Sequence, residues 1–417
     1  MKLKNPIIPG YYPDPSCLRV GEDYYVVTSS FEYFPGVPIW HSRDLVNWKQ
    51  IGYCLTRDSQ LPLQNCGDSR GIWAPTLRYH DGRFYMVTSN MHEGGHFYVY
   101  TDDIQGEWSE PIWVEGGGWD SSLHFDDDGK VYFTWFEIPN RVFQVEIDIE
   151  TGKHLTQKRL IWTGTGTRSP EAPHLYHCFG QYYLMVAEGG TEYGHMCTIA
   201  CSDNPWGPFE SCPHNPILSH RSLDNPIQAT GHGDIFQAHD GSWWIVFLGI
   251  RPVWYPPRYH LGRETFLAPV KWEEGWPVVG LGGFIKPVMK VAGLPLKPWG
   301  PDAEEPEHVD FTQPLGLFWN YLRNPQRENY SLDERPGYLR LKGAAGTVAE
   351  EVSPTFLGRR QRHFHVIAET LVDFEPQVDG EEAGLTSYMN HKHHYEIAVT
   401  MKDGIKKLIF RRQIGTL

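Results

Sequence analysis

The sequence predicts an all-β protein in which a five-bladed β-propeller is followed by a β-sandwich domain. Three observations support this prediction: a strand–turn–strand unit recurs five times, turn dipeptides such as Asp81-Gly82 separate the apolar runs, and helical periodicity is weak throughout. With 417 residues, the chain is longer than one ordinary hydrophobic core requires. One large domain and one smaller domain are therefore expected.

Each copy of the repeat begins with a leading residue, followed by a short strand, a turn and an aromatic pair that opens a second strand. The leading residues lie about 46 to 61 positions apart, and they are Asp14, Ala74, Asp120, Glu171 and His232. The aromatic pairs are Tyr24-Tyr25, Phe84-Tyr85, Tyr132-Phe133, Tyr182-Tyr183 and Trp243-Trp244. A repeat of this length and pattern is typical of a propeller with one blade per copy.

The repeats place the propeller at residues 1–288. A stretch rich in proline and glycine, residues 289–308, is expected to be a linker that lies along the first domain. Residues 309–417 contain short strand candidates typical of a β-sandwich, at 338–341, 365–372, 395–401 and 407–410. With about 110 residues, this second domain is expected to be truncated.

Composition argues against several classes of partner. The formal net charge of −14 provides no basic surface for nucleic acid or anionic lipid, so a neutral ligand is favoured. The longest apolar run, residues 243–250, is too short to span a bilayer, and residues 1–10 lack the apolar segment of a signal peptide. The seven cysteines show no Cys-x-x-Cys spacing, which indicates neither a disulfide framework nor a zinc site. We expect a cytoplasmic protein with no nucleic-acid or membrane partner, and a homo-oligomer is left open.

Three of the five leading residues are carboxylates. Because the innermost strand of each propeller blade starts near the central axis, Asp14, Asp120 and Glu171 are expected to share one pocket, where burial and repulsion separate their pKa values. Two carboxyl groups across a scissile bond are what glycoside hydrolysis needs, and a separation of roughly 6.5–9.5 Å gives inversion. Each acid could instead cap a turn, and the propeller could bind sugars without catalysis. The aromatic residues, 14% of the chain, could stack on sugars or pack the blades.

Several motifs, taken in chain order, resemble those of glycoside hydrolase family 43. They are Gly10-Tyr-Tyr-Pro-Asp14-Pro-Ser16, Phe31-Glu-Tyr-Phe-Pro-Gly36, Gly71-Ile-Trp-Ala-Pro75, Asp120-Ser-Ser-Leu-His-Phe-Asp-Asp-Asp-Gly129, Pro170-Glu171-Ala-Pro-His-Leu-Tyr176, Ala187-Glu-Gly-Gly-Thr191, Gly231-His232-Gly233 and Leu261-Gly-Arg263-Glu-Thr265. The match is to the branch of β-xylosidases and α-L-arabinofuranosidases that carries a C-terminal β-sandwich. This resemblance implies an exo-acting, inverting hydrolase that releases terminal β-D-xylose or α-L-arabinofuranose from short xylo- or arabino-oligosaccharides.

The resemblance also implies a role for each carboxylate. Asp14 would be the general base that activates water, Glu171 the general acid that protonates the leaving oxygen, and Asp120 an ionised carboxylate that raises the pKa of Glu171 and orients it. Glu188, at the end of another apolar strand, is the rival for the general acid. Many relatives have glycine after the acid, whereas this chain has Ala172; a change in local backbone shape there would affect the substrate preference and not the reaction.

The substrate-binding residues follow from the same resemblance. Arg263 would hydrogen-bond the base and sugar hydroxyls. Phe31 and Trp73, with Ala74 beside them, would wall the subsite of the terminal sugar, and Thr191 would contact one of its hydroxyls. Each of these side chains could instead have a structural role within a blade.

His232 leads the fifth copy and is expected near the axis, under the pocket. In parts of the family the matching histidine helps to hold calcium, mostly through waters, so Ca²⁺ near the axis is left open, although the chemistry requires no cofactor. Alternatively, His232 hydrogen-bonds the site. The run from His391 to His394 has no companion ligand pattern and is expected in solvent or on the pocket rim. Five-bladed propeller glycosidases that cleave fructan or arabinan are the alternative enzymes.

Overall fold

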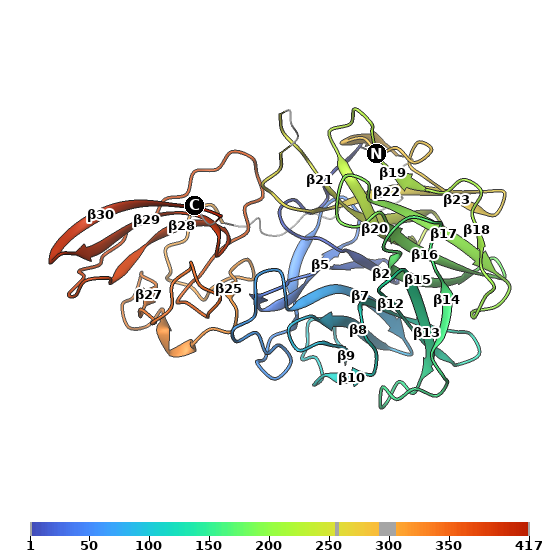
Figure 1. Ribbon diagram of the computed structural model, residues 1–417, viewed down its shortest axis with the longest axis horizontal. Helices are drawn as coiled ribbons and strands as arrows, with labels where there is room; N and C mark the ends of the chain where they lie inside the picture. The colour runs from blue at the N-terminus through green and yellow to red at the C-terminus, as the bar shows by residue number, and fades with distance from the viewer. Residues whose placement is uncertain (1, 255–257, 292–305, 416–417) are drawn as a thin grey trace.

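The computed structural model describes residues 2–254, 258–291 and 306–415, and within these ranges the chain is almost entirely β-structure (Figure 1). The one helix described there is the short 3-10 helix η1 (Arg327–Asn329). Across the same residues, no helix has the length and apolar character needed to cross a bilayer.

Five antiparallel sheets make up the larger part of the molecule, and in each the strands follow their order along the chain, except that the last strand of the fourth sheet pairs with its third strand. The first two contain β2 (Ser16–Val20), β3 (Asp23–Val27), β5 (Gly36–Ser42) and β6 (Lys49–Leu55), then β7 (Ile72–His80), β8 (Arg83–Asn90), β9 (Gly95–Thr101) and β10 (Ile112–Val114). The third contains β11 (Trp119–Phe125), β12 (Val131–Glu137), β13 (Arg141–Ile147) and β14 (Arg159–Trp162). The fourth contains β15 (Glu171–Cys178), β16 (Gln181–Glu188), β17 (Met196–Ser202), β18 (Glu210–Ser211) and β19 (Leu218–Ser219). The fifth contains β20 (Gln228–Gln237), β21 (Trp243–Ile250), β22 (Glu264–Glu273) and β23 (Trp276–Val279).

The first strands of these sheets surround a common axis. β2 contacts β7, β7 contacts β11, β11 contacts β15, β15 contacts β20, and β20 returns to β2. At the periphery, β1 (Lys2–Lys4) pairs with β24 (Val288–Lys290), and Ile8 forms a bridge with Thr265, so the N-terminal segment is tied to the fifth sheet. The predicted β-propeller is confirmed, and its first strands bring residues distant in sequence to one centre.

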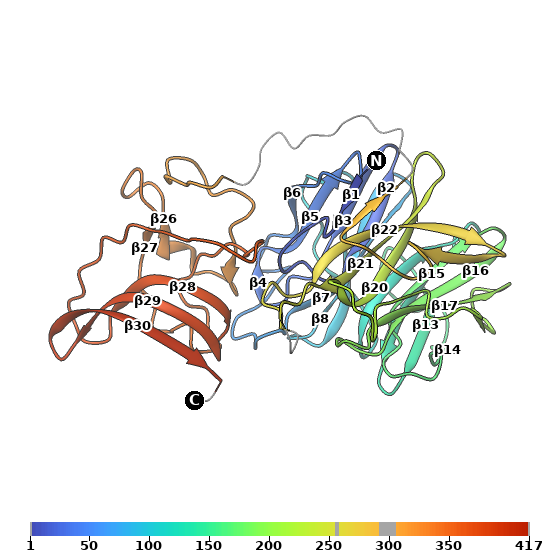
Figure 2. The same ribbon diagram turned by 90° about the horizontal axis from the view of Figure 1, so that it is seen from above.

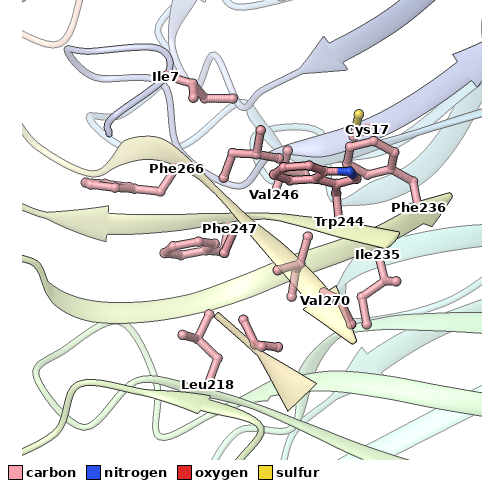
Figure 3. Close-up of a cluster of buried hydrophobic side chains, with 14 of the residues drawn as sticks. Ile7, Cys17, Leu218, Ile235, Phe236, Trp244, Val246, Phe247, Phe266 and Val270 are labelled. Atoms are coloured by element: carbon pink, nitrogen blue, oxygen red, sulfur yellow. The ribbon is translucent and has the colours of Figure 1, made fainter. Parts of the chain in front are cut away.

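The propeller core lies between neighbouring sheets. In the cluster shown in Figure 3, Trp244 of β21 lies near Cys17 of β2, and Phe247 of β21 stacks on Phe266 of β22, with ring centroids 5.6 Å apart. Seven of the eight residues of β21 are buried, in agreement with the continuous apolar run in its sequence. Because the sheets are buried on both faces, the strands are held in place. The polar leading residues lie near the starts of the first strands, so their positions are held as well.

The C-terminal region lies beside the propeller (Figure 2). Its strands are β25 (Tyr321–Leu322), β26 (Tyr330–Ser331), β27 (Arg340–Leu341), β28 (Glu382–Asn390), β29 (His393–Lys402) and β30 (Ile405–Ile414). β28, β29 and β30 form one antiparallel sheet, and β25 pairs with β4 (Tyr33–Phe34) of the propeller. The two parts of the chain are therefore joined by backbone hydrogen bonds as well as by side chains.

The predicted strands of this region agree only in part with the structure. The candidates at 395–401 and 407–410 lie within β29 and β30, and that at 338–341 is reduced to Arg340–Leu341. The candidate at 365–372 is wrong: Ile367 is 91% exposed, and no described strand pairs with this segment. An apolar run alone does not form a strand where no neighbouring strand pairs with it. Of the expected linker at 289–308, Met289 and Lys290 belong to β24 (Val288–Lys290), whereas residues 292–305 lie outside the described residues.

Candidate active site

The leading residues of the repeat share an unusual backbone conformation. Four of them have φ between 36° and 57°, and they are Asp14, Ala74, Asp120 and His232; in the fourth sheet Ala172, directly after Glu171, has φ 48°. The ladders of β7, β11, β15 and β20 each shift register near these residues. A bulge with a left-handed residue redirects side chains from the sheet. This strained backbone therefore accompanies the placement of the carboxylates at the propeller axis.

Asp14 is buried and is bound on both carboxylate oxygens. Arg263 Nη1 lies 2.6 Å from Oδ1, the Ser29 hydroxyl donates to Oδ2 at 2.6 Å, and His232 Nδ1 is 3.7 Å from Oδ1. Burial raises the pKa of Asp14, but the Arg263 charge, His232 and the Ser29 hydrogen bond outweigh it and hold the pKa below its usual value. Asp14 is therefore ionised at neutral pH.

The pKa values of Glu171 and Asp120 are shifted in the opposite direction, above their usual values. Burial and the negative charge of Asp14 raise the pKa of Glu171, although the Trp119 indole donates to its Oε1 at 3.3 Å and opposes the shift. Burial, followed by Glu171 and Asp14, raises the pKa of Asp120 well above its usual value. The sequence predicted an ionised Asp120 that raises the pKa of Glu171. In the structure, the charge that adds to burial at Glu171 is that of Asp14, and the pKa of Asp120 is itself raised because this side chain is only 6% exposed and lies among carboxylates.

Aromatic rings line one side of the carboxylates. The ring centroid of Phe31 is 5.4 Å from that of Tyr11 and 6.5 Å from that of Trp73, and Trp73 is 5.9 Å from Trp119. The Arg263 guanidinium lies 5.7 Å from the centre of the Phe31 ring. These contacts place the predicted wall residues next to the residues that bind Asp14 and Glu171. The Ala74 amide donates to the Ser29 hydroxyl at 2.6 Å, and Ser29 in turn binds Asp14.

A pocket lies between the fourth and fifth sheets, on the Arg263 side of the site. Thr191, Tyr193, His195 and Tyr259 line it together with Arg263. His195 is 2% exposed, and its Nδ1 has no hydrogen-bond partner. Burial lowers the pKa of His195 to about 3, so its ring is neutral. Thr191 therefore lies in the lining of this pocket, and the same lining contains a neutral histidine whose buried Nδ1 is unpaired.

His232 does not lie in a ready-made calcium site. Its two neighbouring carboxylates are already bound: Asp14 by Arg263, and Asp234 by Ser16, Arg78 and Tyr176. Calcium is bound mainly by oxygen atoms, and these residues provide no free carboxylate for direct coordination. Among the described residues, the acid and histidine groups close enough to hold a metal are Asp68–Glu351–His391 and Asp126–Asp127–His177, and neither includes His232.

Glu188, the rival for the general acid, is engaged elsewhere. It is fully buried and accepts hydrogen bonds from the Thr165 amide at 3.0 Å and the Thr198 hydroxyl at 2.7 Å, and from Thr167. A carboxylate held by several donors is typical of a structural role. The sequence reasoning did not identify Ser29, Trp119 or His195 as members of the site. Trp119 directly precedes Asp120, a position that could have indicated it, whereas Ser29 and His195 carry no such signal.

Comparisons with known proteins agree with this arrangement. Residues 3–277 match the glycosyl hydrolases family 43, and residues 308–415 match the β-xylosidase C-terminal concanavalin A-like domain. The chain belongs to glycoside hydrolase family 43. It is therefore a glycoside hydrolase of an inverting family, and the predicted C-terminal β-sandwich is confirmed.

Three relatives illustrate the similarity. The chain is 47% identical to a non-reducing end α-L-arabinofuranosidase of Bacteroides ovatus, covering 99% of this chain and 78% of the relative. It is 37% identical to a β-xylosidase of Bacillus subtilis, covering 98% and 81%. The solved structure of the Bacteroides ovatus xyloglucan PUL GH43B superimposes with a TM-score of 0.93 at 45% identity, covering 99% and 82%.

Proposed function

We propose that this family 43 hydrolase removes terminal α-L-arabinofuranose or β-D-xylose from the non-reducing ends of short oligosaccharides. One observation carries the mechanistic part of this proposal: a single buried site contains a carboxyl group with a lowered pKa, Asp14, and another with a raised pKa, Glu171. Groups shifted in opposite directions provide a base and an acid at the same pH.

In the proposed mechanism, ionised Asp14 takes a proton from a water molecule, which attacks the anomeric carbon. Protonated Glu171 gives its proton to the leaving glycosidic oxygen. Arg263 keeps Asp14 ionised and oriented, since its guanidinium lies 2.6 Å from the carboxylate. Asp120, buried beside Glu171 with a raised pKa, orients the acid.

The choice of sugars is supported by the names of the relatives and by the form of the site. The relatives are an arabinofuranosidase and β-xylosidases, and one from Butyrivibrio fibrisolvens is a xylosidase/arabinosidase. Half-buried Trp73 provides a flat apolar face for a pentose ring, with the buried Phe31 ring packed against it, and Arg263 and Thr191 provide hydrogen-bonding groups. An aromatic face beside hydrogen-bonding groups suits a neutral terminal sugar.

Substitution of the acid tests the assignment. With Glu171→Ala, kcat on glycosides with poor leaving groups should fall by about two to four orders of magnitude, because proton donation is lost. Aryl glycosides with an acidic phenol should lose much less. Glu188→Gln is the matched control and should leave this leaving-group dependence unchanged. Equal turnover of Glu171→Ala and the parent enzyme on both arabinofuranoside and xyloside would disprove the role of Glu171.

Three further expectations are also proposals. Cytoplasmic residence is supported by the seven cysteines, none of which is disulfide-bonded, and cell fractionation tests it. An axial calcium ion would have to be held through waters near His232, and activity with and without a chelator tests it. Homo-oligomerisation is tested by light scattering. A non-catalytic sugar-binding role is disfavoured by the carboxyl pair and is excluded if the purified protein turns over either glycoside.

A further inference from the structure

The loop between the first two propeller sheets, residues 60–71, supports the aromatic wall of the active site. The indole nitrogen of Trp73 donates to the Ser69 carbonyl at 2.8 Å. Phe31 and Ile72 exchange backbone hydrogen bonds of 2.9 and 3.1 Å directly after this loop. The position of the loop therefore determines where both wall residues, Phe31 and Trp73, lie.

The C-terminal domain binds this loop through polar side chains. Arg323, with a fully buried side chain, donates to the Cys66 carbonyl and lies 3.3 Å from Asp68 Oδ1. His391 binds the other oxygen of Asp68 through its backbone amide, at 3.0 Å, and through its ring Nδ1. Asn324 donates to the Leu61 carbonyl at 2.9 Å. These contacts join residues far apart in the sequence and hold both ends of the loop.

A buried carboxyl group on the propeller side joins the same network. Glu32, next to Phe31 in sequence, accepts a hydrogen bond from the Ser69 amide at 3.0 Å, and its backbone carbonyl accepts one from the Arg323 amide at 2.8 Å. Asp68, Glu351 and His391 could in principle hold a metal ion. However, the Arg323 guanidinium already places a positive charge beside Asp68, so the cluster is better explained as an ion-paired junction.

We propose that Arg323 and His391 are positioning residues for substrate binding: through Asp68 and Ser69 they hold Trp73 in the orientation that receives the terminal sugar. Neither side chain touches the carboxylates of the reaction. Their effect therefore passes through a hydrogen-bonded series from the C-terminal domain to Asp68, along the backbone to Ser69, and to the Trp73 indole. This inference rests on the proposed function, because it takes Trp73 as the platform for the sugar.

The test compares His391→Ala with two related variants. Loss of the ring contact should raise KM for an aryl arabinofuranoside about three- to tenfold and change kcat less than about twofold, since the platform binds the sugar and takes no part in proton transfer. His391→Asn, whose amide can reach Asp68 as Nδ1 does, should restore most of the affinity. His393→Ala removes an exposed histidine in the same turn, whose ring contacts Asn390 rather than the loop, and should behave as the parent enzyme.

A double-mutant cycle with Trp73→Phe shows whether the effect passes through the indole. The phenylalanine ring has no N–H group to donate to the Ser69 carbonyl, so His391→Ala should raise KM no further in that background. An unchanged KM in a folded His391→Ala variant would overturn the inference. So would a double variant whose increase in KM equals the product of the increases in the two single variants. Should His391→Ala fail to fold, Asp68→Asn provides the same test from the propeller side. An inactive parent enzyme on both glycosides would instead contradict the proposed function.

Discussion

At the residue scale, the opposite pKa shifts of Asp14 and Glu171 predict a bell-shaped dependence of kcat/KM on pH. Asp14 would act as a base only when ionised. Because its pKa is lowered, kcat/KM should fall only at acidic pH, as the pH drops through the pKa of Asp14. Glu171 acts as an acid only when protonated, and with its pKa raised to about 7, activity falls as the pH rises through neutrality. Measuring kcat/KM for one aryl glycoside across pH determines both limbs.

The hydroxyl of Ser29 contributes to the acidic limb of this profile. Ser29→Ala removes the 2.6 Å hydrogen bond that favours ionised Asp14, so the acidic limb should move to higher pH by up to about one unit. The alkaline limb should not move. Ser30→Ala is the matched control, because the buried Ser30 hydroxyl has no hydrogen-bond partner. The same shift in both variants would show that Ser29 has no specific influence on Asp14.

At the element scale, the left-handed residue Ala172 shapes the start of β15, where Glu171 lies. Ala172 is buried at φ 48°, a conformation in which a β-branched side chain is strongly disfavoured. Ala172→Val should therefore lower the free energy of unfolding by about 1–3 kcal/mol and reduce kcat by disturbing Glu171. Ala172→Gly should keep activity and change stability by less than about 1 kcal/mol. Thermal unfolding and kcat measure both effects.

Ala187 provides the comparison for this substitution. It is buried opposite Glu171 in the ladder between β15 and β16, without a positive φ. Ala187→Gly should destabilise the protein by about 0.5–1 kcal/mol, because glycine increases the conformational entropy of the unfolded chain without a matching gain in the folded strand. If glycine were as costly at position 172 as at position 187, the left-handed backbone would not be the constraint at Ala172.

The limits of sequence reasoning are clearest in these elements. Aromatic pairs and turn dipeptides predicted the strands of the propeller, because burial on both faces makes their apolar pattern strong. The same reasoning failed at 365–372, where Ile367 is exposed and no described strand is present to pair with it. It also could not predict that Asp120 favours its protonated form. That preference depends on the burial and spacing of three carboxylates from different sheets, which only the folded chain defines.

At the scale of the whole molecule, one buried carboxylate connects sheets that are far apart in sequence. Asp234 of the fifth sheet accepts hydrogen bonds from the Ser16 hydroxyl of the first sheet at 2.6 Å and from Tyr176 of the fourth at 2.8 Å. Arg78 of the second sheet lies 3.0 Å from the same carboxylate. Asp234 is 1% exposed, and although burial raises its pKa, the Arg78 charge lowers it to about 2. The network thus joins the first and last sheets of the ring.

Removing the charge of Asp234 should therefore weaken closure of the propeller. Asp234→Asn leaves the Arg78 guanidinium without its counter-charge in a buried site, which costs about 3–5 kcal/mol of unfolding free energy. The temperature of unfolding, measured by calorimetry, should fall by several degrees. Asp102→Asn removes an equally close but exposed partner of Arg83, and should cost less than about 1 kcal/mol. Equal shifts in the two variants would mean that the axial ion pair contributes no more than a surface pair, and ring closure would then depend on the apolar packing between sheets.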